Sequence, residues 1–430
     1  MTQPLLHWSI TAMPETDWQT LTQTVLDRCD QLAAISEMPD GILRQYLTAE
    51  HRRANNLVSE WAEQSGLKPW QDEVGNIWLR YASLQPDAKR LILGSHLDTV
   101  PNAGRYDGIL GVMLGLMVLE VLSADKVELP FHVDVVGFGD EEGTRFGTTL
   151  IGSHAIAGNF NPEWLNIQDC SGTSMAQALS DFGLQPESVY LAALNADEIL
   201  SYLEVHIEQG PVLEDLDQPL GIVTGIAGAK RARIKVQGQA GHAGTTPMHL
   251  RLDALTAAAE LTLQIEALAA KCVFGEVATV GQLHAYPGAT NVIPGMVEMS
   301  LDVRALNDVH LNLLISQLLD FVNGIAQKRS VSFTVDWTHQ APAVVCDERL
   351  QAHLQETAGR LGWSLPSLPS GAGHDAMAAA ELCPVGMLFV RSPRGLSHHP
   401  DESVFSTDIE KALLLFFHSV ASLEVGGRTS

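Results

Sequence analysis

The feature that most constrains the fold is a strand–loop–helix unit around residues 91–119. Residues 91–93 form a short apolar run typical of a buried strand, and the apolar residues 109–119 predict a buried helix. The loop between them carries His96, Asp98 and Asp107. Ligands of open α/β sheets bind beyond the carboxyl ends of the strands, and imidazole with carboxylate suits zinc or a similar divalent cation. For this stretch alone, a purely structural role is the simpler alternative.

Polar side chains also follow or end other predicted strands, at 131–138, 202–207 and 385–390. These side chains are Glu141, Glu142, His206 and His398. A solvated turn or a structural histidine would explain each of them separately. Together with His96 and Asp107 they supply what a two-metal hydrolase needs: two or three ligands for each ion, a bridging carboxylate and a free carboxylate as base.

Composition narrows the classes of partner. The 430 residues carry a formal net charge of -25 and no run of basic residues, which argues against nucleic acid and anionic membranes as partners. Five scattered cysteines without a Cys-x-x-Cys pair argue against a disulfide framework. No signal peptide is apparent, and the longest apolar run, 109–119, is too short to span a bilayer. We therefore expect a soluble cytoplasmic protein.

The order of predicted elements indicates an α/β protein with an inserted domain. Residues 225–340 read as strand, helix, two strands, helix and strand, which is the order of a ferredoxin-like unit. An α/β pattern precedes this segment and resumes after it. We expect residues 1–224 and 341–430 to form one catalytic domain, interrupted by the inserted domain.

Seven short segments resemble the amidase branch of the dinuclear zinc aminoacylase/carboxypeptidase family. This branch includes allantoate amidohydrolase, N-carbamoyl-L-amino-acid hydrolase and β-ureidopropionase. The segments begin at Gly94, Asp107, Gly139, His206, Gly241, Ala289 and Gly395, and the resemblance runs from about residue 45 to 425. It implies a mixed central sheet flanked by helices, as in zinc exopeptidases, with a ferredoxin-like lid and dimerisation domain.

The resemblance also implies the metal ligands. Asp107 would bridge two divalent ions, zinc or manganese, with cobalt or nickel as further possibilities. The other ligands would be His96 and His206 at one ion, and Glu142 and His398 at the other. Asp98 would hold the ring of His96, and Glu141 would be the general base. Spacing to Pro400 favours His398 over its neighbour His399 as the ligand.

Residues of the inserted domain would hold the substrate. By the resemblance, His242 would polarise the scissile carbonyl, reaching into the partner subunit's site of a homodimer. Arg304 would fork onto the substrate carboxylate with Asn291 beside it. Gln209, His374 and Asp375 also match substrate or supporting positions.

The motifs imply hydrolysis of a ureido or amide C–N bond in a small anionic substrate, but they do not identify its side chain. Overall likeness favours allantoate amidohydrolase, which releases ammonia and carbon dioxide. An N-carbamoyl-L-amino-acid hydrolase or β-ureidopropionase with the same machinery is the alternative. Peptide hydrolysis is disfavoured by His206, and a catalytically silent relative by the presence of every expected ligand and of Glu141.

Overall fold

The computed structural model describes residues 16–272 and 275–424, which form two compact units. Unit 1 comprises residues 16–224, 346–368 and 374–424, and unit 2 comprises residues 225–345 and 369–373. The expected inserted domain, 225–340, corresponds to most of unit 2. Unit 2 extends five residues further, to residue 345, and also includes residues 369–373.

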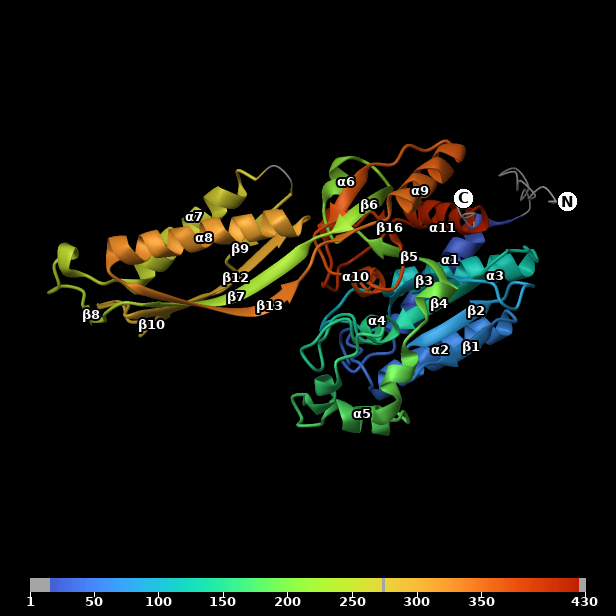
Figure 1. The fold of residues 1–430 in the computed structure, drawn as a ribbon, viewed down its shortest axis with the longest axis horizontal. Helices are drawn as coiled ribbons and strands as arrows, with labels where there is room; N and C mark the ends of the chain where they lie inside the picture. Colours follow the sequence, from blue (N-terminus) through green and yellow to red (C-terminus); the bar gives the residue numbers. More distant parts are fainter. Residues whose placement is uncertain (1–15, 273–274, 425–430) are drawn as a thin grey trace. The chain divides into compact units, whose positions relative to one another are not determined.

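A mixed sheet forms the centre of unit 1, as predicted (Figure 1). Its strands run in the order β1-β2-β4-β3-β5-β16-β6, and β14 and β15 pair with β6. The bounds are β1 (Lys68–Gln71), β2 (Ile77–Tyr81), β3 (Arg90–His96), β4 (His132–Phe138), β5 (Ile199–Ile207), β6 (Leu220–Ile226), β14 (Val344–Val345), β15 (Ser367–Ser370) and β16 (Val385–Val390). Strands β4, β3, β5 and β16 are parallel, so their carboxyl ends lie along one edge of the sheet.

The largest apolar core of unit 1 lies around α3 (Ile109–Ala124), which is buried along nearly its whole length and contacts β3, β4 and β5. Helices α1 (Trp18–Ala33), α2 (Ala49–Gln64), α9 (Glu348–Arg360) and α11 (Ser406–Ala421) share this core. The other helices of unit 1 are α4 (Ile151–Ile156), η2 (Pro162–Asn166), α5 (Met175–Asp181), η3 (Pro186–Ala192), η4 (Ala196–Glu198), α6 (Val212–Asp215), α10 (Ala376–Ala379) and η6 (Pro393–Gly395).

Alternation along β5 places polar side chains opposite the main core. Leu203, Val205 and Ile207 belong to the core under α3, so Glu204 and His206 point to the other face, which α10 contacts. This face is buried too, and strand β5 is buried at nearly every position. His206 is therefore a buried polar residue at a strand exit.

Unit 2 is an antiparallel sheet with two helices on one face (Figure 1). Its strand order is β10-β12-β7-β13, with β9 beside β12, and a separate pair joins β8 to β11. The elements are β7 (Gly228–Gln237), β8 (Gly241–His242), η5 (Met248–Leu250), α7 (Ala254–Ala269), β9 (Val277–Thr279), β10 (Leu283–Tyr286), β11 (Val292–Ile293), β12 (Met296–Ala305), α8 (Asp308–Arg329) and β13 (Ser332–Ala341). That unit 2 acts as a lid or dimerisation domain stays a prediction.

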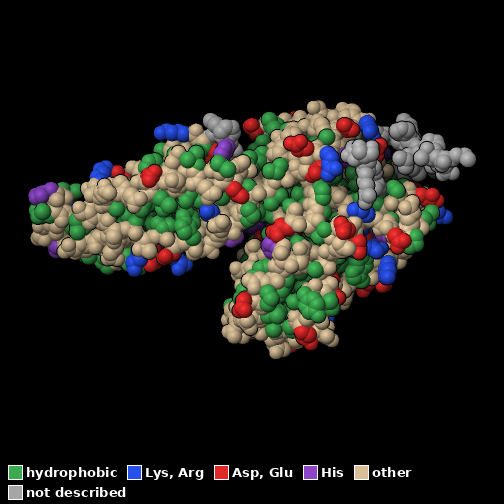
Figure 2. All heavy atoms as spheres, viewed as in Figure 1, with side chains coloured by type: hydrophobic (Ala, Val, Ile, Leu, Met, Phe, Trp, Pro, Cys, Tyr) green, Lys and Arg blue, Asp and Glu red, His purple; other side chains and the backbone are tan. Residues whose placement is uncertain are grey.

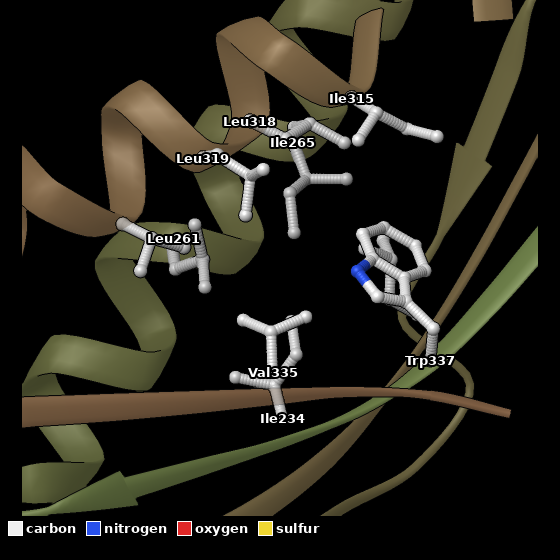
Figure 3. A pocket seen from close by; sticks show the side chains of 10 residues that line it. Ile234, Leu261, Ile265, Ile315, Leu318, Leu319, Val335 and Trp337 are labelled. Atoms are coloured by element: carbon white, nitrogen blue, oxygen red, sulfur yellow. The ribbon is translucent and has the colours of Figure 1, made fainter. Parts of the chain in front are cut away.

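The space between the helices and the sheet of unit 2 is an apolar core. Figure 3 shows side chains of α7 and α8 pointing toward those of β7 and β13, among them Leu261, Ile315 and Ile234. The free volume among them is about 10 Å³, room for about one water molecule. Because only hydrophobic side chains line it, this cavity offers no group that could orient a polar substrate.

Some elements differ from the prediction. Strand β6 was not expected, because two glycines interrupt its short apolar run. Between α7 and α8, where two strands were expected, the described residues form β9, β10, β11 and β12. Before residue 40 the described residues form α1, and residues 1–15 lie outside the described part of the chain.

Surface charge and the apolar helix α8 bear on possible nucleic-acid and membrane partners. On the face that Figure 2 shows, Lys and Arg side chains are scattered among Asp and Glu and gather into no patch. Within the described residues, α8 is the one helix with the length and apolar composition to cross a membrane. Its buried residues, such as Leu314 and Leu318, belong to the core of unit 2.

Candidate metal centre and active site

The carboxyl edge of the parallel strands brings the five expected metal ligands together in unit 1. His96 ends β3, and His206 lies one residue before the end of β5. Asp107 precedes α3, Glu142 follows β4, and His398 follows β16 and η6. Four overlapping groups of side chains at this edge could each hold a metal ion.

Asp107 is the centre of these groups. Its Oδ1 lies 3.6 Å from Nε2 of His96 and 3.2 Å from Nε2 of His206. Its Oδ2 lies 3.3 Å from Nε2 of His398, which is 3.4 Å from Oε1 of Glu142. Each oxygen of one carboxylate thus faces a separate set of ligands.

These distances fit metal coordination. Two ligand atoms about 2.1 Å from one ion, at a tetrahedral angle, lie about 3.4 Å apart. The second nitrogen of each of two histidines is already engaged: Nδ1 of His96 lies 3.0 Å from the carbonyl of Asp98, and Nδ1 of His206 lies 2.9 Å from the carbonyl of Ile207. This orients the Nε2 lone pairs toward Asp107, as metal-binding imidazoles require.

The electrostatics also favour bound positive charge. Burial by itself would lower the pKa of His96, but the carboxylates of Asp107 and Asp98 outweigh it and raise that pKa well above its ordinary value. Asp107 and Glu142 raise the pKa of His398 to about 10. Burial would raise the pKa of Asp107, but the three histidines hold it well below its ordinary value. The site therefore stabilises cations next to Asp107.

Asp98 supports more than the ring of His96. Its carboxylate lies 3.4 Å from Nδ1 of His96 and also accepts the backbone N–H groups of Glu141 and Glu142, at 2.9 and 3.1 Å. One side chain thus ties the loop after β3 to the loop after β4. These bonds fix the backbone of the two adjacent glutamates, while their side chains remain free to face different partners.

Glu141 is separate from the ligand pairs around His398. It shares a group with His96 and Glu142, and its carboxyl is half-buried. Burial is the main cause that raises its pKa well above the ordinary value, and Glu142, Asp375 and Asp98 add to it. A carboxylate that binds a proton readily beside a metal site is what general-base chemistry needs.

Gln209 contacts the expected bridge directly. Its Nε2 donates to Oδ2 of Asp107 at 2.8 Å and lies 3.0 Å from Oγ of Ser397. Its backbone has a positive φ of 57°, as has that of His398 at 54°. Both residues therefore stand in strained conformations at the site, which is common where side chains must be aimed.

Sequence reasoning missed Ser397 and Glu402. The hydroxyl of Ser397 donates to Oδ2 of Asp107 at 2.5 Å, and Glu402 accepts the backbone N–H groups of Tyr106 and Asp107 at 2.8 and 3.2 Å. Both lie within five residues of His398, inside a segment already noted for its histidines. Their proximity to His398 was the only signal.

His374 and Asp375 lie on the polar side of β5. The ring of His374 meets that of His206 edge to face, with centroids 4.5 Å apart. Glu204, His206 and His374 form another buried group of possible ligands. Glu204 accepts the N–H of Ala376 at 3.0 Å, so it ties the turn that carries His374 to strand β5.

His399 faces away from the expected ligands. Its Nδ1 accepts the backbone N–H of Asp401 at 3.0 Å, and its side chain is 52% exposed. His398 instead contacts Asp107 and Glu142. This arrangement agrees with the choice of His398 made from spacing.

Unit 2 brings His242 and Asn291 together but separates them from Arg304. Val292 pairs with His242 in the β8–β11 ladder, which places Asn291 next to that histidine. Arg304 lies near the opposite end of β12, which begins at Met296 on the side of Gly295 and β11. Eight residues of strand span about 26 Å. Asn291 therefore does not stand beside Arg304 within one chain, and its place beside Arg304 at the substrate stays a prediction.

Local contacts prepare two of these side chains for binding. Nδ1 of His242 accepts the N–H of Gly244 at 3.0 Å, so a neutral His242 carries its proton on Nε2 and can donate it. Arg304 donates twice to Asp302, at 2.9 and 3.1 Å, and once to the carbonyl of Gly371 at 2.6 Å. These bonds use three of the five guanidinium N–H groups, so two remain for a ligand.

The sequence pattern of the peptidase family M20/M25/M40 matches residues 92–422, which include all five expected ligands. The chain belongs to this family. Its members are hydrolases with two metal ions, which agrees with the two ligand sets around Asp107.

The chain is also similar to individual amidohydrolases of known sequence or structure. The chain is 40% identical over 400 residues to an N-carbamoyl-L-amino acid amidohydrolase of Geobacillus stearothermophilus, covering 93% of this chain and 98% of the relative. It is 38% identical over 431 residues to allantoate deiminase 2 of Glycine max, covering 92% and 88%. A crystal structure of a hydantoinase/carbamoylase-family amidase from Burkholderia multivorans aligns with a TM-score of 0.87 and 30% identity, over 93% and 97%.

Proposed function

We propose that this protein is a dinuclear metal-dependent amidohydrolase that cleaves a ureido C–N bond in a small carboxylate substrate. The observation that carries the proposal is the pair of ligand sets on the two oxygens of Asp107. Relatives named for N-carbamoyl amino acids and for allantoate, both ureido acids, support the substrate class.

The proposed ligands divide into two sets. His96, His206 and Asp107 would hold one ion, and Glu142, His398 and Asp107 the other. When bound, the ions would polarise the scissile carbonyl and make water acidic enough to supply a nucleophile near neutral pH. Zinc or manganese suits this mixture of imidazole and carboxylate, and cobalt and nickel accept it as well.

Glu141 would be the general base. Its carboxylate shares a group with His96 and Glu142, so it would take a proton from the attacking water and release it to the departing nitrogen. Asp98 accepts the backbone N–H of Glu141, which anchors the main chain from which this carboxylate extends. Asp98 would serve as the support for His96 and for this base.

Arg304 and His242 would hold the two ends of the substrate. The two remaining N–H groups of Arg304 suit a carboxylate, and Nε2–H of His242 suits the carbonyl oxygen. Gln209, already at Asp107, is placed to contact the ureido group, and Asn291 would act beside His242.

The separation of these residues supports the proposal of a homodimer. One small substrate cannot touch both Arg304 and His242 of the same chain, since unit 2 places them near opposite ends of its sheet. We therefore propose that His242 and Asn291 complete the site of the partner subunit. The five cysteines are free, which supports a reducing compartment such as the cytoplasm.

Two substrates remain as candidates. Our leading proposal is allantoate, with ammonia and carbon dioxide as products. An N-carbamoyl-L-amino acid is the second candidate, favoured by the 40% identity to the amidohydrolase of that name. The same metal centre and the same base would serve both.

The test is ammonia release by manganese-loaded protein from allantoate, N-carbamoyl-L-methionine and N-carbamoyl-β-alanine at equal concentrations. A strong preference for allantoate would support the leading proposal. A preference for a carbamoyl amino acid would replace it with the second candidate. Absence of turnover on all three by protein with two bound ions would contradict ureido hydrolysis.

A further inference from the structure

Glu402 is a buried carboxylate that contacts the main chain and the surroundings of Asp107. It is 4% exposed, and its Oε1 accepts the backbone N–H groups of Tyr106 and Asp107. Its Oε2 lies 3.3 Å from Oγ of Ser397, the hydroxyl that donates to Oδ2 of Asp107. Glu402 thus contacts the main chain of Asp107 directly. Ser397 lies between the carboxylate of Glu402 and that of Asp107.

The main chain around Gly104 is shaped for this carboxylate. A Cβ atom at Gly104 would lie 2.0 Å from Cδ and 2.1 Å from Oε1 of Glu402, so any larger residue would displace the glutamate. The φ of Gly104 is not in the left-handed region, so close approach accounts for this glycine better than backbone conformation does. The loop before Asp107 and the side chain of Glu402 therefore fit each other closely.

Placing a second carboxylate here is costly. Glu402 and Asp107 are both buried, at 4% exposure each, and a buried carboxylate costs free energy unless it is paired and hydrogen-bonded. An apolar residue would avoid that cost, but it would leave the N–H groups of Tyr106 and Asp107 without this acceptor. A buried polar group held at such a cost is expected to have a specific task.

We propose that Glu402 is a positioning residue that holds Asp107 in the orientation in which its two oxygens face the two ligand sets. Two sets of contacts hold this orientation. The bonds to the backbone N–H groups fix the position of the Asp107 main chain, and the hydroxyl of Ser397 fixes the rotation of the Asp107 carboxylate. Glu402 and His398 also share one loop, so the same contact sets the distance between Asp107 and His398. The inference rests on the proposed metal-dependent function.

The test is manganese binding by metal-stripped protein, followed through the paramagnetic resonance signal of free Mn²⁺, together with the melting temperature of the same samples. We expect Glu402→Ala to weaken manganese binding roughly 10- to 100-fold, the usual effect of losing a residue that supports a metal ligand. Glu402→Gln keeps one oxygen acceptor and should lose less. Gly104→Ala should resemble Glu402→Ala, because it displaces the same carboxylate without removing it.

Asp72→Ala is the matched control. Asp72 is another buried carboxylate of unit 1 and accepts the backbone N–H groups of Val74 and Asn76, at 3.1 and 2.9 Å. This variant should lower the melting temperature but leave manganese affinity within about threefold of the parent protein. A general loss of stability is thereby separated from a loss of positioning.

Folded Glu402→Gln and Gly104→Ala proteins that bind manganese as tightly as the parent would overturn the proposal, even if Glu402→Ala failed to fold. A control that weakens binding as much as Glu402→Ala would overturn it too. If the parent protein bound no manganese or zinc, the proposed function would fail instead, so the two failures are distinguishable.

Discussion

Two neighbouring glutamates have different proposed roles at the metal centre. Glu141 and Glu142 are adjacent and share an anchor in Asp98, yet Glu142 lies against His398 while Glu141 groups with His96. Sequence alone could place both glutamates at a strand exit. It could not reveal that the Asp98 carboxylate holds both by their backbone, because that contact depends on how two loops meet.

Glu141→Gln tests the base. The variant should retain bound metal, since the amide has nearly the same shape, and lose turnover by roughly three or more orders of magnitude because it cannot carry a proton. Glu142→Gln is the comparison, and it should lose metal as well as activity. Near-parental turnover in Glu141→Gln would exclude it as the base.

Arg304→Ala tests carboxylate recognition. Removing a charge-assisted fork should raise KM roughly 10- to 100-fold, with a smaller effect on kcat. Arg231 is the matched control, because it also pairs with Asp302, at 2.9 Å. Equal KM values for Arg304→Ala and Arg231→Ala would place the carboxylate site elsewhere.

At the scale of elements, close contact between α3 and the sheet positions the site. A Cβ at Gly111 would lie 2.2 Å from the carbonyl oxygen of Val205 on β5, one residue before His206. A Cβ at Gly115, one turn later, would meet side-chain atoms instead: the methyl groups of Val135 at 3.1 and 3.2 Å, and Cβ of Leu93 at 3.7 Å. The same helix therefore has one position that excludes a methyl group and one that nearly accepts it.

Gly111→Ala should consequently destabilise the protein by about 1–3 kcal/mol or more, as overpacking against backbone does, and should reduce metal content by moving β5. Gly115→Ala should have a small effect, since the better helix propensity of alanine offsets a slight repacking. Thermal unfolding and metal analysis measure both. Equal behaviour of the two variants would contradict this account of the α3–β5 contact.

The start of α2 carries a pH-sensitive contact. Nδ1 of the buried His51 accepts the N–H of Leu47 at 3.0 Å, and burial lowers the pKa of His51 to about 3. The unfolded chain takes up this proton near pH 6.5, so stability from His51 is complete above pH 6.5 and is lost as pH falls toward 3. The loss should be about 1.4 kcal/mol for each pH unit in that window.

His51→Asn keeps an acceptor for Leu47 without the proton uptake. Its melting temperature should therefore fall less between pH 7 and pH 5 than that of the parent protein. If both proteins lose the same number of degrees, His51 does not contribute to acid sensitivity.

For the whole molecule, sequence predicts which side chains end the parallel strands, because those ends must share one edge of the sheet. The proposed ligands His96, His206 and His398 could be found in this way. The separation of Asn291 from Arg304 could not, since it depends on the pairing register along β12. Glu402 escaped notice because one acidic residue in a loop has no periodic or motif signal.

Mixing inactive variants tests the dimer. Glu141→Gln and His242→Ala subunits, allowed to exchange at equal amounts, should recover about a quarter of parental activity, because half of the dimers are mixed and each has one intact site. Each variant alone should stay inactive. If the mixture gains no activity while mixed dimers form, His242 acts within its own chain.

If two metal ions around Asp107 carry the reaction, ureido cleavage must depend on bound metal. Protein stripped with a chelator and reloaded with manganese in steps would be assayed for ammonia release from allantoate and N-carbamoyl-L-methionine, with bound metal measured in each sample. We expect no turnover without metal and full turnover on one of these substrates at two ions per subunit. Equal turnover by stripped and reloaded protein, or saturation at one ion, would contradict this expectation.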